Sequence, residues 1–350
     1  MSRSSSNPAT RGGSVTLVTV AARAGVSAQT VSNALNNPDL LRTETLERVR
    51  RAIDETGYRP RRAAQTLRTR SSRLIGYGVR PVQAGKSTPV MDRFLHALSQ
   101  AAESADYRVL LFATSSEEGG LRGYEELIDE HDVDGFVLSD NGERIDPRHA
   151  WLAQSRVPFV SFGRTWSKRQ LGDWVDVDGA SGTDTAVEHL IALGHHKIAF
   201  LGWPRGSGVG DDRANGWRRA MARHGLVTRG RRAESEEDLE AARQSACSLL
   251  DKGATAVVAA SDTLALGCYR ALRDRQAEAG RDVSVIGFDN SPISEMLSPP
   301  LTTIAQPVER VAHECIRLLL ARIENPSKPP EQILLEPTIL VRQSVSQPML

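Results

Sequence analysis

Seven short apolar runs recur along residues 74–288, and amphipathic helical stretches separate them. The runs have the length and side-chain content of buried strands. They are Leu74–Val79, Arg108–Ala113, Gly135–Ser139, Phe159–Phe162, Lys197–Gly202, Ala256–Ala260 and Val283–Phe288. The helical stretches include Met91–Ala105, Thr183–Ala192, Asn215–Arg223 and Asp262–Arg275. Because strands and helices that alternate in this way form parallel sheets with crossover helices, the pattern predicts an α/β core of two lobes.

The charge of the chain is unevenly distributed. The 350 residues carry a formal net charge of +1, but residues 1–73 hold 13 arginines, no lysine and 5 acidic side chains. This first fifth therefore carries +8 and the remainder carries −7. Such an asymmetry favours a small nucleic-acid-binding module attached to a larger body. A basic tail that only aids solubility is the alternative.

Composition and motifs disfavour several other classes of protein. The three cysteines are widely spaced and suggest neither a disulfide framework nor a zinc site. Residues 1–14 are polar, which favours a flexible arm over a secretory signal, and no apolar run approaches the roughly 20 residues that span a bilayer. The Gly206–Gly210 loop lacks the dinucleotide-binding spacing, and no hydrolase or P-loop motif occurs. We therefore expect a cytoplasmic protein with no membrane contact, metal, cofactor or catalytic residues. An enzyme and a free-standing solute-binding protein are the alternatives.

Residues 15–56 read as three helices. Thr16 is suited to cap a first helix that ends at Gly25, and Ser27 is suited to cap a second helix from Ala28 to Leu35. Two short helices joined by a tight glycine turn form a helix-turn-helix. A third helix is predicted over Thr43–Thr56, with Gly57 beyond its end.

The second helix presents a polar outer face. Its outward residues are predicted to be Ala28, Gln29, Ser32 and Asn33. Glutamine and asparagine amides bond adenine in the major groove, and an alanine methyl meets the thymine methyl. Thr30 and Ser32 suit phosphate contacts. A simply solvated polar face is the alternative.

The segment Val15–Asn36 resembles the start of the lac repressor family, the LacI/GalR regulators. It matches the family pattern at Thr16, Leu17, Val20, Ala21, Ala24–Ser27, Thr30–Ser32, Leu35 and Asn36. It departs from the pattern at Thr19, where the family usually has aspartate, and at Asn33, where many members have a base-reading arginine. The resemblance implies a DNA-binding headpiece over residues 15–60, which includes Thr16, Ser27, Asn36 and Tyr58 among its contacts.

Residues 57–67 are similar to the hinge of the same family. By match, Leu67 is the leucine that wedges into the central base step of the operator, with Ala64 packed beside it. Arg61 and Arg62 add positive charge for the minor groove or phosphates. The resemblance implies that two such hinges, within residues 61–72, pair on a near-palindromic operator in a homodimer. An ordinary linker helix with Leu67 in the core is the alternative.

The resemblance continues through the acidic core. The matching segments are Val187–Leu190, Leu193–Gly202, Ser261–Gly267, Val283–Asn290 and Pro299–Ile304. They imply a periplasmic-binding-protein-like core over residues 73–350, with two lobes, three crossovers and an effector in the cleft. We expect a first lobe of about 73–174 and 304–334, and a second of about 175–303 and 335–350.

Ligands of open parallel sheets bind beyond the carboxyl ends of the strands. Candidate effector contacts at those ends are Arg80, Phe162, Arg164, Trp203, Ser261, Asp262 and Asp289. The family match adds Arg213 and supports Ser261 and Asp289. Charged groups bond neighbouring hydroxyls and an aromatic ring covers the apolar face of a pyranose, so we expect a repressor released by a sugar. The alternative to a sugar effector is a purine-like corepressor. The alternatives to effector contacts are a helix-capping role for Asp289 and a surface ion pair for Arg213.

Overall fold

The computed structural model describes residues 15–58, 71–79, 89–114, 120–130, 132–139, 146–166 and 171–349, except for the side chain of Asn36. The chain divides into two compact units, residues 1–72 and residues 73–350. Each unit is described by itself below.

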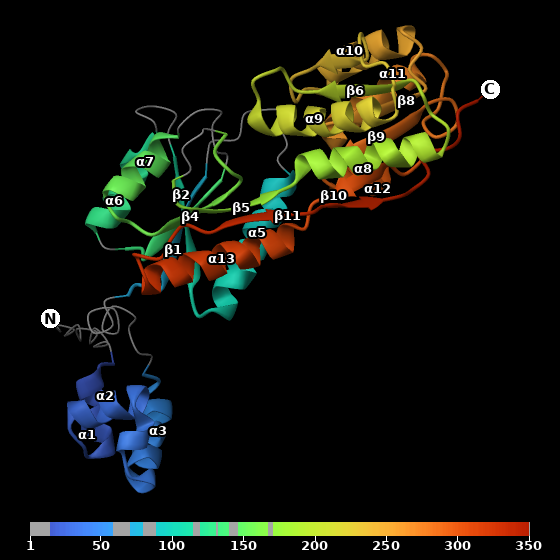
Figure 1. Cartoon of the computed structure of the whole chain (residues 1–350). Coiled ribbons are helices and arrows are strands. Elements are labelled where there is room, and N and C mark those ends of the chain that lie inside the picture. Colours follow the sequence, from blue (N-terminus) through green and yellow to red (C-terminus); the bar gives the residue numbers. More distant parts are fainter. Residues whose placement is uncertain are drawn as a thin grey trace, which may run out of the picture. The chain divides into compact units, whose positions relative to one another are not determined.

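The described part of the first unit, residues 15–58 and 71–72, contains three α-helices around a small apolar core (Figure 1). They are α1 (Leu17–Ala24), α2 (Ala28–Asn36) and α3 (Thr43–Thr56), with a short 3₁₀ turn, η1 (Pro38–Leu40), between the last two. Thr16 caps α1 in a reciprocal pair with Thr19, and Gly25 ends it with a φ of +63°. The threonine at position 19 therefore closes the capping box in place of the aspartate usual in the family. The predicted helix-turn-helix is confirmed, and local caps set both ends of α1 and the start of α2.

The first lobe of the second unit is a parallel sheet of order β11-β5-β4-β3-β1-β2. Its strands are β1 (Leu74–Val79), β2 (Arg108–Ala113), β3 (Gly135–Leu138), β4 (Phe159–Phe162), β5 (Asp173–Val177) and β11 (Gln332–Leu335). Its helices are α5 (Pro89–Ser104), α6 (Arg122–Asp129), α7 (Pro147–Gln154) and α13 (Val308–Glu324). Helices α5 and α13 lie side by side on one face of the sheet, and α6 and α7 cover the other (Figure 1).

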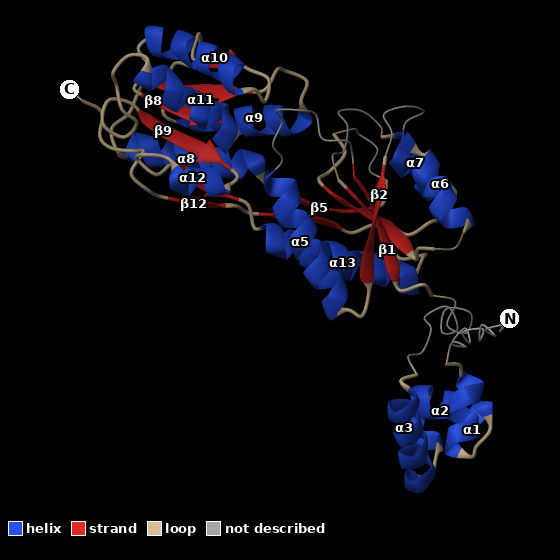
Figure 2. Ribbon diagram, turned by 180° about the vertical axis from the view of Figure 1, so that it is seen from behind, coloured by secondary structure: helices blue, strands red, loops and turns tan. Residues whose placement is uncertain are grey.

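The second lobe has a sheet of order β12-β10-β9-β8-β6-β7, in which only β12 is antiparallel to its neighbour. Its strands are β6 (Ile198–Gly202), β7 (Arg232–Glu234), β8 (Ala256–Ala259), β9 (Ser284–Phe288), β10 (Thr302–Ala305) and β12 (Thr338–Leu340). Its helices are α8 (Gly179–Ala192), α9 (Gly208–Arg223), α10 (Leu239–Asp251), α11 (Asp262–Arg273) and α12 (Pro292–Met296). Helices α8 and α9 pack together, as do α10 and α11, with strands between the two pairs (Figure 2).

The predicted α/β core of two lobes with parallel sheets is confirmed. All seven predicted runs form strands, whereas α8 and α9 begin earlier than predicted, at Gly179 and Gly208. The chain passes between the lobes three times, after β5, after β10 and after β11. These crossings lie slightly later than the sequence predicts, because β5 extends the first sheet to Val177 and β10 extends the second to Ala305.

The carboxyl ends of strands from both sheets contribute to one pocket in this unit. Phe162 ends β4, Val177 ends β5 and Phe288 ends β9, and all three line it. None of the helices in the described ranges has the length and hydropathy of a membrane-spanning segment. The described residues also contain no group of three or more His, Cys, Asp or Glu side chains that could hold a metal ion.

Candidate functional site

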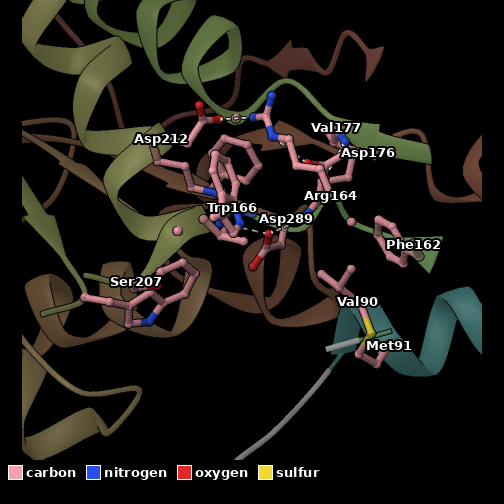
Figure 3. A pocket seen from close by; sticks show the side chains of 18 residues that line it. Val90, Met91, Phe162, Arg164, Trp166, Asp176, Val177, Ser207, Asp212 and Asp289 are labelled. Carbon is pink, nitrogen blue, oxygen red and sulfur yellow. Dashed lines mark hydrogen bonds and ion pairs between the residues drawn. The ribbon is translucent and has the colours of Figure 1, made fainter. Parts of the chain in front are cut away.

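The pocket between the lobes has a volume of about 450 Å³, within the range of small-molecule sites (Figure 3). Both lobes contribute polar and aromatic side chains to it. The lining residues of the first lobe are Val90, Met91, Phe162, Gly163, Arg164, Trp166, Asp176 and Val177. The lining residues of the second lobe, and of the segment that leaves it after β10, are Gly179, Trp203, Ser207, Gly208, Val209, Asp212, Arg213, Phe288, Asp289 and Gln306.

Arg213 lies at the base of the second-lobe wall of the pocket. Its side chain is buried, and its guanidinium group stacks on the Phe288 ring at 3.6 Å from the ring centroid. The Nη1 atom donates to the carbonyl oxygen of Ala260 and lies 3.4 Å from Asp289 Oδ1. Arg213 is therefore a pocket residue held by an aromatic face and a carboxylate, and not a surface ion-pair partner.

Asp289 follows β9 and faces the same space. Its Oδ1 accepts a hydrogen bond of 2.7 Å from Gln306 Nε2, and its side chain keeps 16% of its surface exposed. It does not cap the next helix, because Ser291 occupies the N-cap of α12. Burial raises the pKa of Asp289 to about 7, against the lowering effect of Arg213. This carboxyl group is thus poised between its two protonation states near neutral pH.

We expect Asp289 to give the core a measurable pH dependence. Its pKa is higher in the folded protein than the ordinary 3.8, so folding takes up a proton between about pH 4 and pH 7. The resulting stabilisation is present at low pH and is lost as the pH rises through about 7. Relative to Asp289→Asn, the wild type should therefore lose free energy of unfolding across this window. Urea denaturation followed by tryptophan fluorescence measures both proteins, and parallel pH curves would contradict the assignment.

Arg164 joins the two lobes across the pocket. Its guanidinium lies 3.0 Å from Asp176 Oδ2 in the first lobe and 3.0 Å from Asp212 Oδ2 in the second. The same group lies over the Trp166 ring at 4.2 Å. Burial raises the pKa of Asp176 to about 6 and also raises that of Asp212, and in both cases Arg164 opposes the shift. This ion-pair network depends on the relative position of the lobes.

Trp166 makes a second contact between the lobes. Its indole lies so close to Gly208 that a Cβ at that position would be 2.0 Å from the ring. Gly208 is the first residue of α9, which is capped by Ser207. Only a residue without a side chain fits under the indole, so this glycine has a packing role in addition to opening the helix.

Two candidate residues, Ser261 and Asp262, are not among the lining residues. Ser261 caps α11 and donates to Glu237 Oε1 at 2.8 Å, while Glu237 Oε2 accepts from Trp203 Nε1 at 2.5 Å. Asp262 is buried and accepts from the backbone and hydroxyl of Ser291 and from Thr303. Ser261 thus supports the Trp203 side of the pocket through Glu237, and Asp262 holds the loop after β9.

The structure brings five of the eight candidate effector residues to the pocket, namely Phe162, Arg164, Trp203, Arg213 and Asp289. Arg80 lies outside the described residues. Sequence reasoning did not include Asp176, Asp212 and Gln306. Asp176 belongs to β5 (DWVDV), where aspartates interrupt the apolar run that would predict a strand, and Gln306 follows β10, which begins with two threonines.

The candidate DNA-contacting residues fall into three groups in the structure. Ala28 and Gln29 are exposed and Asn33 is half-buried on α2, while Ser27, Thr30 and Ser32 take part in hydrogen bonds or other interactions. Thr16 is occupied in the α1 cap, and the ring of Tyr58 is buried in the headpiece core. The remaining candidates have no described side chain; they are Asn36, Arg61, Arg62, Ala64 and Leu67.

Two family models match the chain. The model of bacterial regulatory proteins of the lacI family matches residues 16–61, and that of the periplasmic binding protein-like domain matches residues 187–345. The curated HTH-type transcriptional regulator CelR of Thermobifida fusca is 34% identical over 94% of this chain and 98% of its own. The HTH-type transcriptional repressor PurR of Vibrio campbellii is 31% identical over 95% of this chain and 99% of its own.

Solved structures show the same similarity. The lac repressor dimer bound to operator and the anti-inducer ONPF superimposes with a TM-score of 0.81 at 27% identity, over 95% of this chain and all of that one. The complex of the transcriptional regulator CelR with cellobiose gives a TM-score of 0.70 at 29% identity, over 94% of this chain and 99% of that one. The similarity therefore covers the headpiece and both lobes.

Proposed function

The chain belongs to the lacI family of bacterial transcriptional regulators, and we propose that it is a repressor released from its operator by a small uncharged carbohydrate. Regulation of transcription and DNA binding are shared by its relatives. The chemical class of the effector and the direction of the response are the parts we propose. We also propose that the protein is cytoplasmic, because its relatives are DNA-binding transcriptional regulators.

The charge balance of the pocket carries the carbohydrate proposal. Each lining guanidinium already lies beside a carboxylate: Arg164 beside Asp176 and Asp212, and Arg213 beside Asp289. The described lining thus offers two positive and three acidic groups, with no guanidinium left without a carboxylate neighbour. A phosphorylated or carboxylated ligand would have to compete with these carboxylates for the two guanidinium groups. An uncharged polyol does not depend on an unpaired cation.

The shape of the lining fits a sugar ring. Trp166, Trp203 and Phe162 offer flat apolar surfaces, and Asp289 and Arg213 offer charged hydrogen-bonding groups next to them. Charge-assisted hydrogen bonds to hydroxyl groups are stronger than neutral ones, and aromatic faces cover the apolar C–H surface of a pyranose. One relative was solved with cellobiose and another with ribose.

The response requires the ligand to prefer one arrangement of the lobes. Among the described residues, the lobes are joined around the pocket by Arg164 with Asp212, by Trp166 with Gly208, and by Arg93 of α5 with the carbonyl oxygens of Asp289 and Asn290. A ligand that binds among these groups replaces some of these contacts with its own. The resulting change in lobe position, carried to the hinge, separates the paired headpieces.

We further propose a homodimer on a near-palindromic operator. Apolar side chains remain exposed on the core, including Leu111 on the edge strand β2 and Met296 at the end of α12. Leu266, Tyr269 and Leu297 line a groove close to Met296. A symmetric dimer would cover these surfaces and present two headpieces to two half-sites. The related lac repressor structure is a dimer on its operator.

A ligand screen tests the effector class. Neutral mono- and disaccharides, including cellobiose and ribose, are compared with sugar phosphates and purine bases by thermal unfolding of the full chain. We expect a neutral sugar to raise the unfolding temperature, because it binds the folded core and not the unfolded chain. The same sugar should lower the affinity of the protein for an operator duplex, because it favours the lobe arrangement that separates the headpieces. Stabilisation by sugar phosphates alone would contradict the proposal, and a purine that raises DNA affinity would indicate a corepressor.

A separate experiment tests the proposed hinge, residues 61–72, of which residues 61–70 lie outside the described residues. Leu67→Ser should lower operator affinity by about tenfold or more, since the apolar wedge that holds the kinked base step is lost. Arg61→Ala with Arg62→Ala should instead flatten the salt dependence of binding. Fluorescence anisotropy with a labelled operator measures both. Unchanged operator affinity in both variants would show that this segment is only a linker.

A further inference from the structure

The first residue of the core, Arg73, is held in an unusual backbone conformation. It directly precedes β1, and it follows residues 61–72, the proposed hinge. Its φ is +55°, in the left-handed region that favours glycine over a residue with a side chain. This conformation turns the backbone, so Arg73 sets the direction in which the preceding residues leave β1. Such a conformation persists only where the surrounding contacts enforce it.

Contacts of the backbone and of the side chain enforce the conformation of Arg73. Its amide donates a hydrogen bond of 3.1 Å to Asp134 Oδ2, and its carbonyl oxygen accepts one of 3.0 Å from the Arg108 amide. Its guanidinium lies 5.1 Å from the centroid of the Tyr107 ring, which is buried in the core of the first lobe. Hydrogen bonds to a carboxylate are stronger than those between neutral groups, so the position of the Arg73 amide depends most on Asp134.

These partners of Arg73 all belong to the first lobe. Asp134 immediately precedes β3, and Tyr107 and Arg108 lie at the start of β2. They therefore flank the amino end of β1, which lies between β3 and β2 in the sheet. The pocket lies at the opposite, carboxyl end of the same sheet. A packed sheet is a rigid element, so a shift of the first lobe displaces Arg73 with it.

We propose that Asp134 is a positioning residue for operator binding, because it fixes Arg73, the residue to which the hinge is joined, to the first lobe. The inference rests on the proposed hinge and on DNA binding by the headpiece, and it is independent of the effector. With Arg73 fixed, a movement of the lobe reaches the hinge as a change in position. With Arg73 loose, rotation of its backbone absorbs the same movement, and DNA binding has to restore the lost order.

The operator affinity of the full-length chain tests the proposal. A duplex that the wild type selects from a random-sequence library serves as the operator, and a scrambled duplex of the same composition measures nonspecific binding. Asp134→Ala should lower affinity for the selected duplex by about tenfold, the effect of ordering about one backbone residue on binding. It should not lower affinity for the scrambled duplex. Asp134→Asn keeps an oxygen acceptor and should lose much less. Fluorescence anisotropy measures each affinity.

Asp132→Ala separates this positioning role from an effect of charge. Asp132 is exposed and lies two residues before Asp134, so its substitution makes the same change in charge nearby. Removing a negative charge leaves the attraction to DNA phosphates unchanged or strengthens it, whereas the proposal expects a loss. A lower operator affinity in Asp134→Ala but not in Asp132→Ala supports the proposal. An Asp134→Ala affinity equal to or above that of the wild type, or equal losses in both variants, would overturn it.

A pair of substitutions at Arg73 decides the matter if Asp134→Ala fails to fold, which thermal unfolding shows. Arg73→Asn and Arg73→Val lose the same charge and the same contact with Tyr107. Asparagine tolerates a positive φ and valine does not, so Arg73→Val should bind the selected duplex several-fold more weakly than Arg73→Asn. Equal affinities in these two variants would contradict the proposal.

The outcomes also distinguish this inference from the proposals on which it rests. If the wild type enriches no sequence, specific DNA binding is refuted and the inference falls with it. If Leu67→Ser leaves operator affinity unchanged while Asp134→Ala lowers it, the wedge is wrong and the positioning role stands. A negative result in the ligand screen leaves this experiment unaffected.

Discussion

Replacing Arg213 with alanine is expected to abolish the response to the effector while operator affinity stays unchanged. Arg213 lies at the base of the pocket, and its guanidinium compensates the charge of Asp289 at 3.4 Å. Without it, burial keeps the Asp289 carboxyl protonated at neutral pH, so the ligand loses both a cationic donor and an anionic acceptor. Loss of two charge-assisted hydrogen bonds corresponds to a decrease in ligand affinity of about 100-fold or more. Calorimetric titration and operator anisotropy measure the two affinities.

Two further variants separate a binding role for Arg213 from a packing role. Arg218→Ala removes an arginine from the exposed face of the same helix and should leave ligand affinity unchanged. Arg213→Lys keeps the charge but loses the planar stack on Phe288, so it should retain folding and bind ligand more weakly than the wild type. Wild-type ligand affinity in both Arg213 variants would show that this arginine does not contact the effector.

Gly216→Ala is expected to destabilise the second lobe by about 3 kcal/mol, at the upper end of the usual cost of overpacking. Gly216 lies on α9, and a Cβ there would be 2.0 Å from the carbonyl oxygen of Ala180 on α8. The obstacle is backbone, so the two helices must move apart to admit a methyl group. That separation also disturbs the pocket, because Asp212 Oδ2 accepts from the Ala180 amide at 3.0 Å.

Thermal unfolding of the full chain measures the effect of Gly216→Ala. Asn215→Ala is the matched control, because the neighbouring residue is exposed and tolerates alanine in a helix. We expect a drop of several degrees in unfolding temperature for Gly216→Ala and almost none for the control. Equal unfolding temperatures would mean that α8 and α9 pack less closely than the structure indicates.

The headpiece could be predicted almost to the residue because its signals are local. Thr16, Gly25, Ser27 and Gly57 each act on the helix end beside them, through a cap or a positive φ. The Arg23–Glu55 contact between α1 and α3 was not predictable in this way, because it joins residues far apart in the sequence.

The lobes were predicted less completely, for two reasons. Strands with unbroken apolar runs were found, but β5, β7, β10, β11 and β12 were missed because they carry charged or polar residues or lie at sheet edges. Helices α8 and α9 begin within glycine-rich segments, where propensity argues against a helix. There, tertiary packing of the helix against its neighbour outweighs the local preference.

The sequence by itself determined the class of molecule: a basic helix-turn-helix, an acidic α/β core, and polar residues at strand ends. These follow from caps, periodicity and charge, which act over a few residues. Only the tertiary structure decided which polar residues share the pocket. It placed Arg164 between Asp176 and Asp212, turned Asp262 away into the loop after β9, and paired Gln29 with Asn33. Such pairings depend on where separate elements and side chains meet in space, and the free energy of burying a charge depends on the partner that it meets there.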